Sequence, residues 1–430
     1  MKDNANAKTA SPLSLAAVVF MFAAFTSLAS AQSTVPVYKQ SDPVSDYLDA
    51  IDIAESELSA YSLELSDLYL GLGKSHLSKQ EYNRARQAFQ RGMQIERVNF
   101  GLNSLSQTPY LMSIAEAESY LGNWEESQKA LENLYLINTE AYGARDPRML
   151  PVLDELLDWY LGTYGDRSTS GGYQNLVISE KLGTRMQSIL DQTNDLSDPA
   201  VPGMYRKLSH LHYFIANHIK KHGEPSEQGF TFNTTSTASS SKSTSHMHYR
   251  RGKLALQKVV ESLELREDTL ARDQANAIAE LGDWYLVFGQ RSSANHAYKL
   301  AYDFLGESEQ SEGLQEELFG AAKLIEFTDL NSKISPPKMV VGDSAASSNE
   351  DSSTVLEQKP LEISMAINSN GVPRNIEIIN PPEDLDKDIR RTIFKDIRAQ
   401  RYRPQLLEGA PIISAINFSY GMQQFAEKRE

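Results

Sequence analysis

A pattern of apolar and small residues recurs along this chain with a period of 42 residues, and this self-similarity limits the possible folds more than any other feature. The first copy, residues 66–92, predicts two helical segments joined by a short turn. Small residues let two antiparallel helices approach closely, and aromatic residues fill the space beside them. The positions that we expect to pack in this way are Tyr69, Leu72 and Gly73 in the first helix and Ala85, Phe89 and Gly92 in the second.

Further copies of the pattern follow along the chain. One period onward, a helix leads into a turn at residues 122–124, and after a second period the turn is expected at Gly165. The best later match spans residues 276–305, with its turn at Gly289. We therefore predict a helical array over residues 45–330. The packing positions in the later match are Gly282, Tyr285, Ala294, Tyr298 and Ala301.

These offsets resemble those of the tetratricopeptide repeat. That family has a large residue, Leu, Gly or Ala, and Tyr in its first helix, and Ala, an aromatic residue and Ala in its second. The period here is longer than the family's usual ~34 residues, as in repeats with extended helices. The resemblance implies an α-superhelical array that holds a peptide or another protein and has no preformed catalytic pocket. A helical bundle without superhelical repeats is the alternative interpretation.

Two polar stretches interrupt the apolar pattern. Residues 224–248 are rich in Ser and Thr, and residues 331–358 combine two prolines with a run of Ser, Asp and Glu. Both have little apolar surface with which to form a core. We predict that the first is a flexible loop within the array and that the second is a linker to a C-terminal domain.

The C-terminal residues, 359–425, change from helical to alternating periodicity. Apolar residues alternate with polar ones from Leu361 to Ile367, a turn signal follows, and an apolar stripe of every fourth residue then predicts a helix over residues 385–397. A last strand is expected from Ile412 to Tyr420. The sequence thus predicts a small α/β domain with the order β-β-α-β in a chain that is otherwise mainly α.

Four short motifs occur in order over this region. They are Asn370-Gly371-Val372-Pro373, Leu385-Asp386, Arg401-Tyr402-Arg403-Pro404 and Gly409-Ala410-Pro411-Ile412. In this order they resemble the C-terminal domain of TonB-type proteins. The resemblance implies binding of envelope partners, often by addition of a strand to the edge of the sheet. We expect a fragment of about residues 355–430 to fold alone.

Two groups of residues in this domain are candidates for contact with a partner. Cationic side chains on the helix and after it would suit an acidic surface, which could be the acidic remainder of this same protein. A plain solvated face is the alternative. Apolar residues of the last strand would suit an extended segment. The candidates are Arg391, Lys395, Arg398, Arg401, Tyr402, Arg403, Ile412, Ile416 and Phe418.

The N-terminus predicts export. Lys2 and Lys8 precede an apolar run, Leu13–Leu28, which ends in Ala29-Ser30-Ala31. This order is typical of a signal peptide, here residues 1–31, and predicts a periplasmic protein with no membrane span after cleavage. An uncleaved inner-membrane anchor is the alternative, and it would suit a TonB-related energy transducer that assists outer-membrane transport. Against a transducer, the apolar run has no His and leads into the array instead of a Pro/Lys-rich segment.

Charge and composition exclude several classes of function. The net charge is −15, and residues 32–358 carry −17, which argues against nucleic acid as a partner. The chain has no cysteine, which excludes disulfides, thiol nucleophiles and thiolate metal sites. His218 and His222 have a spacing at which two imidazoles could meet one metal ion, but Lys220 and Lys221 lie between them. We predict a non-enzymatic binding protein with no metal and no cofactor, whose partners are envelope proteins or extended peptides.

Overall fold

The computed structural model describes residues 42–166, 172–222, 239–307, 313–327, 361–379, 381–382, 385 and 387–420. The predicted signal peptide, residues 1–31, and the predicted linker, residues 331–358, lie outside the described residues. Residues from Pro43 onward belong to one compact unit.

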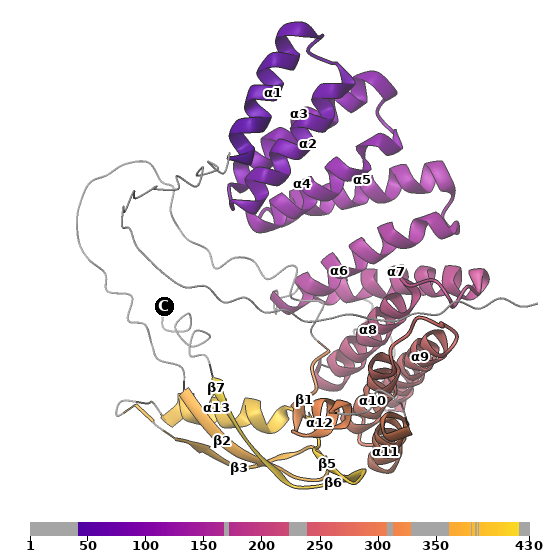
Figure 1. The fold of residues 1–430 in the computed structure, drawn as a ribbon, viewed down its shortest axis with the longest axis vertical. Coiled ribbons are helices and arrows are strands. Elements are labelled where there is room, and N and C mark those ends of the chain that lie inside the picture. The colour runs from indigo at the N-terminus through magenta and orange to yellow at the C-terminus, as the bar shows by residue number, and fades with distance from the viewer. Residues whose placement is uncertain are drawn as a thin grey trace, which may run out of the picture. The chain divides into compact units, whose positions relative to one another are not determined.

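Successive helices pair into antiparallel hairpins (Figure 1). After α1, the hairpins are α2–α3, α4–α5, α6–α7, α8–α9 and α10–α11, and each packs against its neighbour along the chain. The helix bounds are α1 Pro43–Glu57, α2 Leu63–Ser78, α3 Tyr82–Phe100, α4 Thr108–Tyr120, α5 Trp124–Tyr142, α6 Leu150–Asp166, α7 Gly172–Thr193, α8 Val201–His222, α9 Ser239–Glu264, α10 Ala271–Val287, α11 Arg291–Glu307 and α12 Leu314–Phe319. The predicted helical array is confirmed as an array of hairpins.

Two of the turns inside the hairpins contain a glycine in a left-handed conformation. Gly122 and Gly289 follow α4 and α10 with φ of 74° and 79°, a left-handed conformation that costs glycine little. Both turns were predicted at these residues. The turn predicted at Gly165 is wrong, because α6 continues through Asp166.

Part of the predicted flexible loop, residues 224–248, is helical. Helix α9 begins at Ser239, in the middle of the Ser/Thr-rich run. Its first turns lead to His248, which is 1% exposed and lies against His212 of α8. The segment is therefore helical despite the low intrinsic helix propensity of Ser and Thr. Residues 224–238 lie outside the described residues.

The C-terminal unit, residues 361–420, is a three-stranded antiparallel sheet with one helix on it (Figure 1). The strand order is β3-β2-β7, and Ile363 of the central strand pairs with Ile378 and Phe418 on either side. Alternate residues of β2 are buried against Ile393 and Ile397 of the helix. The bounds are β2 Leu361–Ile367, β3 Pro373–Ile378, α13 Lys387–Ala399 and β7 Ser414–Tyr420.

The predicted β-β-α-β order is therefore present, with additions between the helix and the last strand. Two-residue strands β4 (Tyr402–Arg403), β5 (Leu406–Leu407) and β6 (Ala410–Pro411) follow α13. The last strand begins at Ser414, and Ile412 precedes it, where its N–H donates to the Gln405 carbonyl.

The C-terminal unit is joined to the helical array by backbone and core contacts. Strand β1 (Lys323–Leu324), which follows the last array helix, pairs with β4. Leu406 of β5 belongs to the same apolar cluster as Tyr298 and Phe319 of the array. The core of the predicted domain thus extends beyond residues 359–425, and a fragment of residues 355–430 would lose these contacts.

Candidate functional site

The predicted repeat-packing glycines lie where neighbouring helices touch. A methyl group on Gly73 would overlap the ring of Phe89, and one on Gly282 would lie 2.5 Å from Cε1 of Tyr298. In both hairpins the aromatic residue follows the glycine by 16 positions. Gly92 instead lies against the next hairpin, where a methyl group on it would be 2.5 Å from Cε1 of Tyr110, 18 positions along the chain. Gly73 and Gly282 thus lie at close contacts inside a hairpin, and Gly92 lies at a contact between hairpins.

The other predicted packing residues are also in the array core. Ala85, Ala294 and Ala301 are fully buried, and Leu72 is 5% exposed. Tyr69 and Tyr285 are half-buried. The Tyr69 hydroxyl donates to Glu55 Oε1 at 3.0 Å. These residues pack between the helices of the array and do not form a common surface that a partner could contact.

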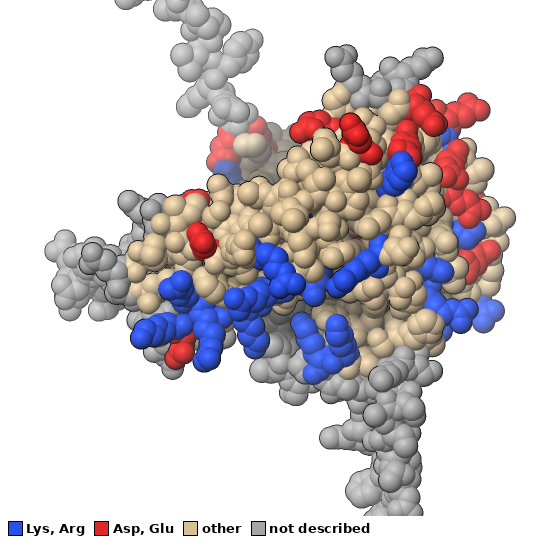
Figure 2. Space-filling model, turned by 90° about the horizontal axis from the view of Figure 1, so that it is seen from below, with Lys and Arg blue, Asp and Glu red and all other residues tan. Residues whose placement is uncertain are grey.

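Helix α13 carries a basic face, defined here as Lys387, Arg391, Lys395 and Arg398. All four are exposed and recur at intervals of four, four and three residues, opposite the buried Ile393 and Ile397. Three of the predicted partner residues thus share one face. Within the described part of the chain, Arg391 and Lys395 form no ion pair. Figure 2 shows a band of Lys and Arg side chains on one face of the molecule.

Strand β7 forms one edge of the sheet. The N–H of Ile379 donates to the Glu362 carbonyl at 2.8 Å, so the backbone groups of Glu362 point toward β3. The backbone N–H and C=O groups of successive residues point to alternate sides of a strand. The backbone groups of Ile363 therefore point toward its β7 partner, Phe418. The N–H groups of the intervening β7 residues, among them Asn417, therefore point away from the sheet.

The side chains of β7 divide between the two faces of the sheet. Ile416 and Phe418, both predicted partner residues, pack on the core beside α13. Ala415, Asn417 and Ser419 are exposed. The edge thus presents backbone groups and small or polar side chains, whereas the apolar side chains pack in the core beneath the sheet.

The cationic residues after α13 do not form part of an exposed face, which corrects the prediction for Tyr402 and Arg403. Both are 4% exposed. Arg403 binds the Asp283 carboxylate of α10 with two hydrogen bonds, Nη2 to Oδ2 at 2.6 Å and Nε to Oδ1 at 3.1 Å. The acidic surface that receives Arg403 is therefore on the protein's own array. Arg401 is half-buried, and its guanidinium donates to the carbonyl of Gln400 at 2.7 Å.

A tyrosine completes the buried Arg403 site. The Tyr298 hydroxyl donates to Asp283 Oδ1 at 2.8 Å. Burial and the adjacent Asp283 raise the pKa of Tyr298 well above its ordinary value. Burial opposes the charge of Arg403, but Asp283 beside it holds the Arg403 pKa above its ordinary value. The charges are thus retained and paired, which suits a structural contact. Asp283 was not among the predicted residues. The sequence signal that could have indicated it is an acidic residue on the apolar face of a predicted helix, next to Gly282 and Trp284.

Two histidines meet in the array core. His212 Nδ1 and His248 Nδ1 are 3.0 Å apart, so one donates and the other accepts. Burial, with the neighbouring His248 and Arg251, lowers the pKa of His212 to about 3, and burial with Arg251 lowers that of His248 to about 4. Both rings are therefore neutral at physiological pH. Among the described residues, no group of three or more His, Asp or Glu side chains is arranged to hold a metal ion.

The part of the chain that the structure describes contains no helix both long and apolar enough to cross a membrane.

Solved structures that are similar to this chain include the two described here. No family model matches the sequence, and no curated protein matches it. The structure of BtubC from P. vanneervenii is similar to 61% of this chain and 90% of its own, with 11% identity and a TM-score of 0.43. A kinesin light chain from Podosopora anserina with nearly identical TPR-like repeats is similar to 57% of this chain and 99% of its own, with 14% identity and a TM-score of 0.39.

Proposed function

We propose that this protein is a non-enzymatic adaptor of the cell envelope that binds other proteins through its C-terminal unit. The observation that carries the proposal is the basic face of α13. Four exposed cations lie on one side of a helix whose other side is buried, in a chain with a net charge of −15. A cationic surface of this kind attracts and orients an acidic protein partner.

The edge of β7 supports the same function. An exposed strand edge with outward N–H groups can pair with an extended segment of another protein, and backbone bonds make little demand on the partner's sequence. The C-terminal motifs resemble those of TonB-type domains, for which strand addition is a common mode of binding. The two surfaces together would recognise an acidic partner with an extended segment.

The helical array supplies the scaffold in this proposal. Its hairpins pack through Gly–aromatic contacts in a manner similar to tetratricopeptide repeats, and such arrays hold proteins or peptides. The Arg403–Asp283 pair fixes the C-terminal unit to the array, so a partner bound at α13 is held at a defined place on the scaffold.

The basic face is tested by crosslinking from single positions in cells that produce the native protein. A photoreactive residue at position 395 should give discrete crosslinks to an acidic protein, and Arg391→Glu in the same chain should abolish them. Gln257, exposed on α9, is the matched control position. The same products from both positions, or products that Arg391→Glu leaves unchanged, would contradict the proposal.

The location in the envelope is tested separately. Mass spectrometry of the protein from cells should find an N-terminus near Gln32, in the soluble periplasmic fraction. An intact N-terminus in the membrane fraction would favour the transducer instead.

A further inference from the structure

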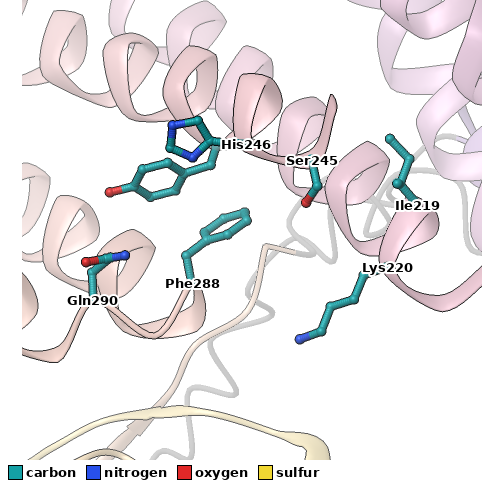
Figure 3. Close-up of a pocket in the computed structure, with 7 residues that line it drawn as sticks. Ile219, Lys220, Ser245, His246, Phe288 and Gln290 are labelled. Atoms are coloured by element: carbon teal, nitrogen blue, oxygen red, sulfur yellow. The ribbon is translucent and has the colours of Figure 1, made fainter. Parts of the chain in front are cut away.

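A cavity of about 410 Å³ lies where three helices of the array end or begin (Figure 3). Lys220 is in the last turn of α8, Ser245 and His246 are near the start of α9, and Phe288 and Gln290 form the turn between α10 and α11. None of these residues belongs to the basic face of α13 or to the edge of β7. The volume lies in the range of small-molecule sites, roughly 300–1,000 Å³.

One wall of the cavity is aromatic and well supported. The rings of Tyr249 and Phe288, whose centroids are 5.1 Å apart, line it. Behind them, the fully buried Trp284 lies 4.7 Å from Phe288 and stacks at 6.5 Å on Tyr249. The Trp284 Nε1–H also donates to the Tyr249 carbonyl at 3.2 Å. Because this wall is packed before any ligand arrives, an aromatic ring can stack on it with little loss of side-chain freedom.

The opposite part of the lining is polar and cationic. Lys220 is exposed at the cavity and has no ion pair within the described part of the chain. Ser245 and Gln290 add a hydroxyl and an amide, and Figure 3 shows Phe288 lying between Gln290 on one side and Lys220 and Ser245 on the other. The described lining contains no Asp or Glu. The charge of the site therefore favours an anionic group next to the aromatic wall.

We propose that this cavity is a binding site for a small aromatic carboxylate. The ring of the ligand packs on Tyr249 and Phe288, its carboxylate pairs with the Lys220 ammonium, and the Ser245 hydroxyl donates to the remaining carboxylate oxygen. This function is separate from the binding of a protein partner at the C-terminal unit, and either can fail without the other.

The test is calorimetric titration of the full chain with 3-phenylpropionate, its neutral amide and propionate. The carboxylate should bind more tightly than the amide, by about tenfold or more, because only the carboxylate can form an ion-paired, charge-assisted hydrogen bond with Lys220. Propionate, which lacks the ring, should bind more weakly than either. Lys220→Gln should remove the preference for the carboxylate, whereas the matched control Lys221→Gln, at the exposed neighbouring position outside the lining, should retain it.

A second variant tests the aromatic wall. Phe288 is half-buried, so Phe288→Leu keeps an apolar side chain there and should weaken binding of both aromatic probes, with an unchanged circular dichroism spectrum. Equal affinities for acid and amide, equal effects of the two lysine variants, or no heat of binding would each overturn the proposal. Binding of a phenylalanine-containing peptide with no binding of 3-phenylpropionate would also overturn it, since the site would then belong to a peptide.

Discussion

Arg403 of the C-terminal unit and Asp283 of helix α10 form a two-bonded ion pair that is almost fully enclosed, with Nη2 2.6 Å from Oδ2. The two residues are 120 positions apart in the sequence. Arg403 lies in β4, the short strand that pairs with β1, and its register partner there is Lys323. Arg403 was predicted to contact a partner, but its side chain instead joins the C-terminal unit to the array.

The first prediction concerns this pair. Arg403→Met leaves the Asp283 charge buried without its partner, and the free energy of unfolding should fall by about 3–5 kcal/mol. Asp283→Leu should have an effect of similar size for the same reason. The double variant should be less destabilised than the sum of the single variants. Chemical denaturation of the full chain measures all three, and strictly additive losses would show that the pair does not interact.

The second prediction concerns the glycines of the repeats. Gly282→Ala places a methyl group against the Tyr298 ring and should cost about 1–3 kcal/mol of unfolding free energy. Gly203, inside α8, is the matched control, because a methyl group there meets no atom within 4 Å. Gly203→Ala should stabilise the protein by up to about 1 kcal/mol through helix propensity. Equal melting temperatures for the two variants would contradict the assigned packing.

The third prediction concerns acid stability. The pKa values of His212 and His248 are lowered to about 3 and about 4, so the unfolded chain binds protons at these residues below pH 6.5 while the folded chain does not. Above pH 6.5 these two histidines do not lower the free energy of unfolding. As the pH falls from 6.5 toward 4, protonation of the unfolded chain lowers it progressively. His248→Gln should flatten the fall in melting temperature over this range, whereas His296→Gln, at an exposed position, should leave it unchanged. Identical pH profiles for the two variants would refute this assignment.

The fourth prediction concerns the edge of β7. Asn417→Pro removes an N–H that points away from the sheet, so the fold should persist while affinity for an extended partner segment falls about tenfold. Asn417→Ala changes only the side chain and should bind as the unchanged protein does. Backbone amide shifts of β7 during titration with the segment give the readout. Equal affinity of the proline and alanine variants would mean that the partner does not pair with this edge.

Local patterns in the sequence were sufficient for much of the fold. Gly73 and Phe89 form a contact within one hairpin, and the 16-residue spacing that predicts it recurs at Gly282 and Tyr298. The alternation of β2 likewise predicts a strand with one buried face. Such features depend on residues close together in the chain, where helical or strand periodicity decides which side chains share a face.

Contacts between distant segments could not be predicted in this way. Nothing near Arg403 indicates that it meets Asp283, because no local periodicity links residues 120 positions apart. The beginning of α9 could not be predicted for a similar reason, since α9 meets α8 through His248 and His212, which are 36 positions apart. The cavity beside Phe288 is formed by three separate helix ends, and no single segment shows it.

The basic face of α13 is tested most directly with the partner that is captured from position 395. Its affinity for the full chain should be measured with Arg391→Glu and Lys395→Glu, and with Gln257→Glu as the control for added negative charge. We expect the two α13 variants to lose about tenfold or more in affinity, the loss to shrink as salt is raised, and the control to bind normally. Affinity that is unchanged in the α13 variants, or lowered equally by Gln257→Glu, would contradict this expectation.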